Sequence, residues 1–247
     1  MPDRMENNCL LSVCSNNCRL LKHNEMTVHN LCSMYDIIIL HEHWLMPHKL
    51  CMLNSVHNDF DGIGQSAIDT SHDLVAGRPY GGTAILSKKH LATNISSVVT
   101  NNSRITGIHV SMSSGKLLLL NIYMPCNYGD DEGMIEYMEC LGDLNAVMIE
   151  SDAVNTVIAG DFNCNTESKF FPLLDSFLQE NGLIMSDMLK LSHVDTYVSD
   201  DGLRCSWIDH ILCSQSLVSV VSDVTVLSHV IATDHRPLVF NADNILH

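Results

Sequence analysis

The chain has 247 residues, of which 46% are hydrophobic and 17% charged, a composition that predicts a packed core and excludes extended disorder. No apolar run reaches the ~18 residues that a membrane span needs. The formal net charge of −16, from 13 basic and 29 acidic residues, argues against a protein that binds nucleic acid through a broadly basic surface.

Short apolar runs with strand character recur along the chain, and two longer segments, 132–150 and 168–181, have apolar residues at helical spacing. The region 57–81 is rich in Asp, Gly, Ser and His and predicts a long surface loop. The strand-like runs are residues 10–14, 36–40, 82–87, 105–112, 117–123, 154–159, 208–213 and 224–231. Strands that outnumber helices in this way predict an α/β fold in which two sheets pack together with helices outside.

Nothing in the composition divides the chain, so we expect an N-terminal tail over residues 1–9 and a single domain over residues 10–247. The N-terminus has an arginine and two acids ahead of a very short apolar patch, which does not make a signal peptide. We therefore expect an intracellular protein, cytoplasmic or nuclear, with no membrane partner. Its ten cysteines are expected to be reduced thiols.

The stretch Leu40-His41-Glu42-His43-Trp44-Leu45 follows an apolar run and suggests a metal site. In a strand the two histidines would share one face while Glu42 points to the other, so the three cannot easily hold one ion. A His-x-His pair can bind zinc, but it needs a third ligand. Glu42, at the expected end of a buried strand, either points into a site or caps a turn.

Three further motifs place polar residues beside apolar runs. Gly160-Asp161-Phe162-Asn163 puts a carboxylate and an amide on one face, where they could activate a water and donate to a phosphoryl oxygen, although a simple Asx-rich turn has the same pattern. Ser206-Trp207-Ile208-Asp209-His210 begins another run, and Asp234-His235 precedes the last expected strand, Pro237-Leu238-Val239-Phe240. A histidine oriented by a carboxylate is more readily cationic, which suits it to a developing phosphorane charge.

Taken in order, these residues resemble the endonuclease/exonuclease/phosphatase superfamily of magnesium-dependent phosphodiesterases, over about residues 10–241. The resemblance implies a four-layer α/β sandwich of two packed mixed β-sheets flanked by helices, with strand-end loops converging on one metal-centred site. The residues that carry it are Asn17, Glu42, Tyr123, Asp161, Asn163, Asp209, Asp234 and His235.

Within the superfamily the chain is most similar to the endonuclease domain of non-LTR (LINE-type) retrotransposons. Four segments carry this finer likeness: Asn17-Cys18-Arg19, Glu42-His43-Trp44-Leu45, the run Gly-Arg-Pro-Tyr-Gly-Gly-Thr-Ala-Ile-Leu at 77–86, and Ser206-Trp207-Ile208-Asp209-His210. The likeness implies a DNA-nicking enzyme that cleaves a target site for reverse transcription. DNA is then the expected partner, together with a reverse transcriptase domain in the complete element.

The resemblance also implies a role for each residue. Glu42 is the principal ligand of Mg²⁺, or alternatively Mn²⁺, with Asn17 beside it and Asp234 assisting through metal-bound water or through the histidine. Asp161 orients or deprotonates the attacking water. His235, supported by Asp209, donates to the phosphate.

Substrate contacts are implied for Tyr123 and Asn163 at the scissile phosphate, and for Thr196 and Ser206. The segment 195–205 predicts a hairpin with Asp-Gly in its turn, which in retrotransposon endonucleases enters the DNA minor groove. Here the tip has Asp200 and Asp201, which phosphates would repel.

The chain departs from the family pattern at Ser15 and Asn16, where an aromatic or apolar residue is usual, and at His41, which replaces a glutamine. A protonated His41 would compete with the metal by charge, so we expect activity to fall below about pH 6.5. Two alternatives stay open: a phosphatase or lipid phosphodiesterase of the same superfamily, whose small substrate would suit the acidic surface, and an inactive retrotransposon remnant.

Overall fold

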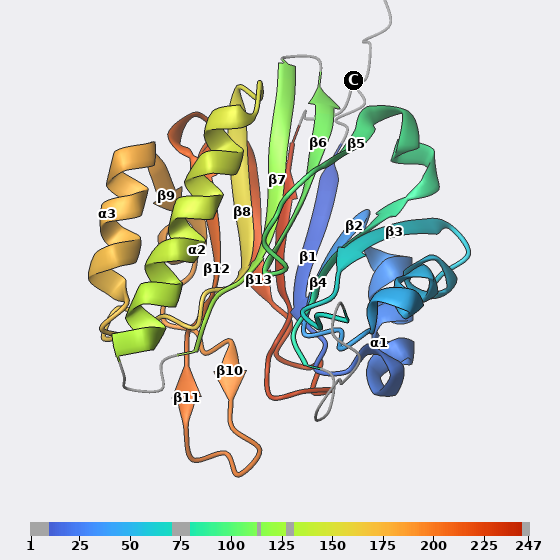
Figure 1. Cartoon of the computed structure of the whole chain (residues 1–247), viewed down its shortest axis with the longest axis horizontal. Helices are drawn as coiled ribbons and strands as arrows, with labels where there is room; N and C mark the ends of the chain where they lie inside the picture. The colour runs from blue at the N-terminus through green and yellow to red at the C-terminus, as the bar shows by residue number, and fades with distance from the viewer. Residues whose placement is uncertain (1–9, 71–79, 113–114, 127–130, 244–247) are drawn as a thin grey trace, which may run out of the picture.

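Two six-stranded mixed sheets pack face to face and are flanked by helices (Figure 1). The computed structural model describes residues 10–70, 80–112, 115–126 and 131–243. The first sheet has the order β13-β14-β1-β2-β4-β3 and the second the order β5-β6-β7-β8-β12-β9. This arrangement confirms the expected four-layer sandwich. The tail expected over residues 1–9 lies outside the described residues.

The first sheet joins both ends of the described chain, because β14 pairs antiparallel with β1 while β1 pairs parallel with β2. Its strands are β1 (Leu11–Asn17), β2 (Ile37–His41), β3 (Phe60–Gln65), β4 (Thr83–Lys88), β13 (Val221–Val226) and β14 (Leu238–Ala242). Its outer face is covered by α1 (Leu21–Met34) and by the 3₁₀ segment η1 (Pro47–Ser55).

The second sheet is covered on its outer face by α2 (Asp131–Glu150) and α3 (Phe171–Asn181), as Figure 1 shows. Its strands are β5 (Ile95–Val98), β6 (Ile105–Met112), β7 (Gly115–Tyr123), β8 (Asn155–Asp161), β9 (Leu183–Met185) and β12 (Asp209–Ser214). The remaining elements are η2 (Lys89–Asn94), α4 (Ser186–Lys190), η3 (Gln215–Leu217) and the hairpin β10 (Tyr197–Val198) and β11 (Cys205–Ser206). No described helix is both long and apolar enough to cross a bilayer.

The central strands are continuous apolar runs because both of their faces are buried. Ile37 and Ile39 point into the core between the sheets, while Ile38 and Leu40 pack under α1. The run Leu117–Leu120 divides in the same way between the inter-sheet core and the core under α2 and α3. A sheet that is covered on both sides dictates this pattern, in place of the alternation of a half-exposed sheet.

Three sequence expectations need correction. The region 57–81 is not only a loop, because β3 forms the edge of the first sheet, where its small residues Gly62 and Gly64 press against Leu53 of η1. The strand expected over 224–231 is β13, which begins and ends earlier in the chain than the sequence predicted. Helix α1 was not expected, because it buries only four residues on a short, weakly apolar stripe. The hairpin predicted over 195–205 is confirmed, with Gly202 in a left-handed turn conformation at φ 69°.

Candidate active site

Four strand ends from the two sheets meet at one end of the sandwich. Asn17 ends β1, and Glu42 follows β2, whose last residue pairs with Asn17. In the other sheet Tyr123 ends β7 and pairs with Asp161, which ends β8. Because β1 and β2 run parallel to each other, as do β7 and β8, their carboxyl ends lie at the same edge of each sheet and bring these side chains together.

Asn17 connects the two sheets at this point. Its Nδ2 donates to Glu42 Oε1 at 2.8 Å and to Asp161 Oδ2 at 3.2 Å, and its side chain is buried. Its Oδ1 accepts the backbone N–H of Arg19 at 3.2 Å. Asn17 therefore positions two carboxylates beside each other, next to the expected metal ligand Glu42.

Glu42 leaves the strand in a left-handed conformation, with φ 54°, so its side chain does not follow the alternation of β2. Trp44, whose role the sequence did not reveal, also has a positive φ of 57° and donates from its indole Nε1 to Glu42 Oε2 at 3.1 Å. Both oxygens of Glu42 thus have a donor. The Glu-x-Trp spacing in the sequence was the only signal for this contact.

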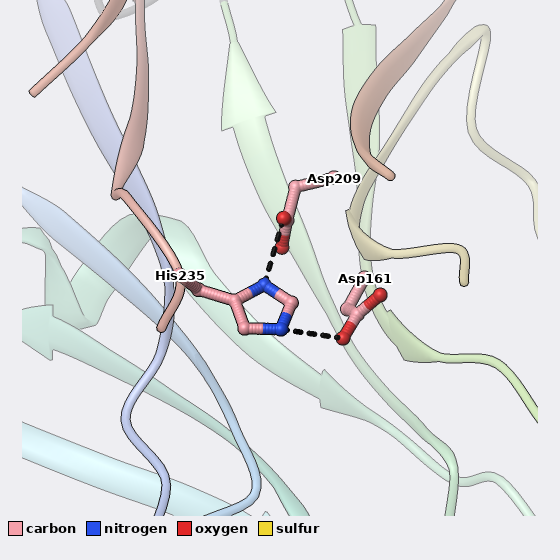
Figure 2. Close-up of side chains that lie close together, drawn as sticks. All are labelled: Asp161, Asp209 and His235. Carbon is pink, nitrogen blue, oxygen red and sulfur yellow. Dashed lines mark hydrogen bonds and ion pairs between the residues drawn. The ribbon is translucent and has the colours of Figure 1, made fainter. Parts of the chain in front are cut away.

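Asp161, His235 and Asp209 form a buried chain of acid and base groups (Figure 2). His235 Nδ1 donates to Asp209 Oδ2 at 2.9 Å, and its Nε2 lies 3.6 Å from Asp161 Oδ2. Asp209 opens β12 directly opposite Asp161, while His235 reaches the same point from the first sheet, just before β14. Residues 161, 209 and 235 therefore meet only because the two sheets are packed together.

The environment shifts the proton affinities of these groups in opposite senses. Burial raises the pKa of Asp161 to about 7, with the charges of Asp209 and Glu42 adding to the rise and that of His235 opposing it. Burial alone would lower the pKa of His235, but Asp209 and Asp161 raise it to about 10. Burial also opposes ionisation of Asp209, yet His235 holds the pKa of that carboxyl below its ordinary value. Near neutral pH the site therefore has a cationic imidazole, an ionised Asp209 and an Asp161 close to its own pKa.

Two further residues complete the wall of the site. Burial raises the pKa of Tyr123, and the nearby charge of Glu42 raises it further, so its hydroxyl keeps its proton and remains a hydrogen-bond donor. Asn163 is left-handed, with φ 47°, and its backbone N–H donates to Asp161 Oδ1 at 2.9 Å. Its Nδ2 donates to the Met124 carbonyl at 2.8 Å, which anchors the loop and leaves one N–H of the amide for a substrate.

The two histidines of the HEHW stretch have other roles. Both nitrogens of His43 contact backbone groups, accepting from Leu45 N at 2.9 Å and lying 2.9 Å from the Gln65 carbonyl. A Cβ at Gly82, whose φ is 84°, would collide with the His43 ring, so glycine is required there. His41 is fully buried, and burial lowers its pKa to about 4. It stays neutral near pH 6.5, so the fall in activity that we expected from its protonation must be assigned to another group.

Three predicted site residues lie elsewhere. Thr196 is fully buried, and its Oγ1 accepts the N–H groups of Ile208 and Asp209 at 3.1 and 3.0 Å, so it fixes the start of β12 and has no surface for DNA. Asp234 pairs with Arg19 at 3.1 Å instead of joining the cluster as a metal ligand. Ser206 is partly exposed on the hairpin and accepts from Asn165 at 2.9 Å. Residues 77–79 of the Gly-Arg-Pro segment lie outside the described residues.

The donor set fits a divalent cation. One ligand atom from each of Asp161, Asp209 and His235 lies within 4.8 Å of the others, but carboxylates face both ring nitrogens of His235, so the ring is not free to bind a metal. The remaining donors are the carboxylates of Glu42 and Asp161, which are the hard oxygen ligands that Mg²⁺ and Mn²⁺ prefer. The raised pKa of Asp161 reflects an excess of buried negative charge that a cation beside it would offset.

Such a site can activate a water and stabilise negative charge on a phosphoryl group. The chain belongs to the endonuclease/exonuclease/phosphatase family, whose model matches residues 17–235. This match confirms the resemblance seen in the sequence and places the chain among hydrolases of phosphate ester bonds. Nucleases of this family generally use a divalent metal, in agreement with the donor set.

Solved structures with the same fold include three DNA-processing proteins, each similar to nearly the whole chain. A variant of the 3′ phosphatase NExo from Neisseria, bound to product DNA hairpin, has a TM-score of 0.71 at 17% identity and covers 93% of this chain and 98% of its own. The endonuclease domain of TRAS1, a telomere-specific non-LTR retrotransposon, has a TM-score of 0.69 at 15% identity and covers 94% and 98%. The Xenopus laevis APE2 catalytic domain has a TM-score of 0.72 at 15% identity and covers 96% and 93%. Identities this low show the shared fold alone, and a search of curated protein sequences gives no match.

Proposed function

We propose that the chain is a divalent-metal-dependent phosphodiesterase that nicks DNA, working as the endonuclease of a non-LTR (LINE-type) retrotransposon. The observation that carries the proposal is the buried Asp161–His235–Asp209 chain beside the Asn17–Glu42 pair. It offers an acceptor for the proton of an attacking water and a cationic donor for the phosphoryl oxygens within one small volume.

The roles follow from these contacts. The ionised Asp161 accepts a proton from a water that attacks phosphorus, and the bond from phosphorus to one ester oxygen breaks. His235, kept cationic and oriented by Asp209, donates to a phosphoryl oxygen as its charge grows, and the protonated hydroxyl of Tyr123 and the free N–H of Asn163 donate beside it. Glu42, held by Asn17 and Trp44, would bind Mg²⁺, or alternatively Mn²⁺, which when bound supplies further charge stabilisation.

The retrotransposon assignment is supported by the segments that flank these residues in the sequence. Arg19, in the segment Asn17-Cys18-Arg19, pairs with Asp234 at the rim of the site. Trp44, in the segment that begins at Glu42, donates to Glu42 within the site. A reverse transcriptase of the same element would be the functional partner. The TRAS1 endonuclease domain, which shares the fold, is a precedent for this function on this scaffold.

Nicking of supercoiled plasmid tests the proposal. The purified chain should convert supercoiled to open-circular DNA in Mg²⁺, not in EDTA, and Asp161→Ala should abolish the reaction by removing the proton acceptor. Asp223→Ala, which removes an exposed aspartate on β13, is the matched control and should nick as the wild type does.

The alternatives give different results in the same preparation. Hydrolysis of a small phosphomonoester without nicking would indicate the phosphatase, and folded protein that turns over neither substrate would indicate the inactive remnant. Nicking that survives Asp161→Ala would overturn the assigned role of Asp161.

A further inference from the structure

Two arginines face one hollow beside the candidate active site. The hollow has a volume of about 400 Å³ and lies between the start of α1, the loop 231–234 and the tip of the β10–β11 hairpin. Arg19 and Arg236 line it, in a chain that has only 13 basic residues against 29 acidic ones. In Figure 1 the hairpin projects from the end of the sandwich where these loops gather.

Arg19 lies at the rim of the site itself. Its backbone N–H donates to the side chain of Asn17, which holds Glu42 and Asp161. Its guanidinium donates from one nitrogen, Nη1, to a carboxylate oxygen of Asp234 at 3.1 Å. The positive charge of Arg19 is therefore fixed next to the loop that carries His235. A group bound by Arg19 would therefore lie beside a phosphate that occupies the site.

The hairpin contributes a carboxylate to the same guanidinium. Both carboxylate oxygens of Asp200 lie 3.4 Å from the same nitrogen, Nη1 of Arg19, which is a long contact. The side chain of Asp200 is 77% exposed and that of Arg19 is 42% exposed. Exposed pairs of this kind are weak and easily displaced. The second guanidinium of the hollow, that of Arg236, is held by the carbonyls of Thr233 and His235 at 2.8 and 3.4 Å, and no carboxylate of the described residues pairs with it.

We propose that Arg19, with Arg236 beside it, binds a backbone phosphate of the nucleic acid next to the scissile one, and that Asp200 occupies this position as an internal substitute until the nucleic acid displaces it. The proposal rests on the function proposed above and names a contact of that same site. A phosphate suits the position because a guanidinium binds it through two parallel N–H bonds, which the single-nitrogen contact with Asp200 does not use. Only the side chain of Asp200 has to move when a strand enters, because the backbone N–H of Val198 holds the hairpin to the Asp234 carbonyl at 2.7 Å.

The test compares two aspartates at the hairpin tip. Asp200→Asn removes the carboxylate that contacts Arg19, whereas Asp201→Asn removes the same charge from a residue that contacts Ser199 and the Leu203 N–H instead. Each of the two aspartate variants is made both in the wild-type chain and in the Arg19→Ala chain. Affinity for a short fluorescein-labelled DNA duplex is measured by anisotropy at low salt in EDTA, so that no cleavage occurs.

With Arg19 present, Asp200→Asn should bind the duplex about threefold more tightly than Asp201→Asn, because only the first frees the guanidinium. With Arg19→Ala the two should bind equally. Equal affinities of the two variants with Arg19 present, or a difference that survives Arg19→Ala, would overturn the proposal that Asp200 occupies a phosphate position at Arg19. If Arg19→Ala does not fold, Arg19→Gln provides the same comparison.

The binding cycle is independent of catalysis. Failure of plasmid nicking would count against the proposed function, but the affinities of the variants could still be compared. Absence of DNA binding by the wild type at low salt would overturn the phosphate site directly. A parallel measurement follows the binding of inorganic phosphate alone, without DNA, to the wild type and to Asp200→Asn. If Asp200→Asn gains affinity for free phosphate but none for the duplex, the hollow binds the free ion and the assignment to a nucleic-acid strand is wrong.

Discussion

The side chains to which we assign the reaction are held in position by neighbouring side chains. Asn17 fixes Glu42 and Asp161 with one amide nitrogen, and Trp44 fixes the second oxygen of Glu42. Thr196 fixes the backbone at Asp209 from within the core. Because such contacts hold the reacting groups within a narrow range of positions, their loss reduces activity even where every reactive side chain remains.

At the scale of residues, we predict that Mg²⁺ raises the Tm of the metal-free protein more at about pH 8 than at about pH 6. The pKa of Asp161 is raised by burial from 3.8 to about 7, so ionisation of Asp161 costs the folded protein stability as the pH rises through 7, and a cation offsets that charge. His235, with its pKa raised from 6.5 to about 10, stabilises the fold fully below pH 6.5, and this effect is lost progressively as the pH rises from there through 10, with or without the cation. His41, with a pKa of about 4, does not titrate in this window.

Differential scanning calorimetry at the two pH values measures the gain. Asp161→Asn keeps the size of the side chain but removes its titration, so its gain should be the same at both. Equal gains in the wild type would show that Asp161 does not sense the cation. The same ionisation would make activity fall on the acid side of pH 7, which replaces His41 as the physical cause of the expected decline.

The sequence could predict most of the side chains that meet at this site because they lie at the ends of apolar runs and match a family motif. It could not predict how they are held. The contact of Trp44 with Glu42 depends on two departures from strand geometry, at residues 42 and 44, and that of Arg19 with Asp234 joins residues 215 positions apart. Contacts of this kind depend on tertiary packing, which local patterns do not encode.

At the scale of elements, a second His–Asp pair lies on the outer side of the second sheet. His210 Nδ1 lies 2.8 Å from Asp187 Oδ2, and its Nε2 lies 2.9 Å from the Cys164 carbonyl. Asp187 Oδ1 also accepts the N–H of Ile211 at 3.0 Å. The pair connects β12 to α4 and to the loop that carries Asn163. The position of the Asn163 side chain therefore depends on a buried ion pair that the sequence around residue 163 does not indicate.

Replacement of His210 by alanine should lower the free energy of unfolding by about 3–5 kcal/mol, because it leaves Asp187 buried without its charge partner. Urea denaturation measures the loss. The matched control is His109→Ala, which removes a half-buried histidine whose Nε2 contacts the Ser151 hydroxyl at 2.8 Å, and it should cost about 1 kcal/mol. Equal losses in the two variants would mean that the His210–Asp187 pair contributes no more than an ordinary hydrogen bond.

The central strands and helices α2 and α3 could be predicted because burial on both faces, or on one stripe, leaves a clear apolar pattern. The elements that were missed lack it. Strand β3 is an edge strand of glycines and polar residues whose pairing with β4 depends on the neighbour, and α1 is half polar around its circumference. The close approach of β7 and β8 at Gly160, where a Cβ would collide with the Ile122 carbonyl, is likewise visible only in the assembled sheet.

At the scale of the whole molecule, the net charge of −16 limits how the proposed binding of DNA can occur. With phosphate contacts restricted to a few cations such as Arg19 and Arg236, the logarithm of DNA affinity should fall with the logarithm of salt concentration with a slope of only about −2. Anisotropy titrations over a range of NaCl concentrations measure it, and Arg19→Ala should make the slope shallower by about one. A slope steeper than about −6 in the wild type would require a basic surface that these two arginines do not provide.

The first sheet is closed by the last strand of the chain, since β14 pairs with both β1 and β13. On a ribosome, Asn17, Glu42 and Asp161 therefore emerge long before the strand that brings His235 to them. The nascent chain cannot assemble the reactive cluster until residues 238–242 have left the exit tunnel. A gene interrupted by a stop codon before that strand would keep most of the motif residues in its reading frame and still not assemble the cluster.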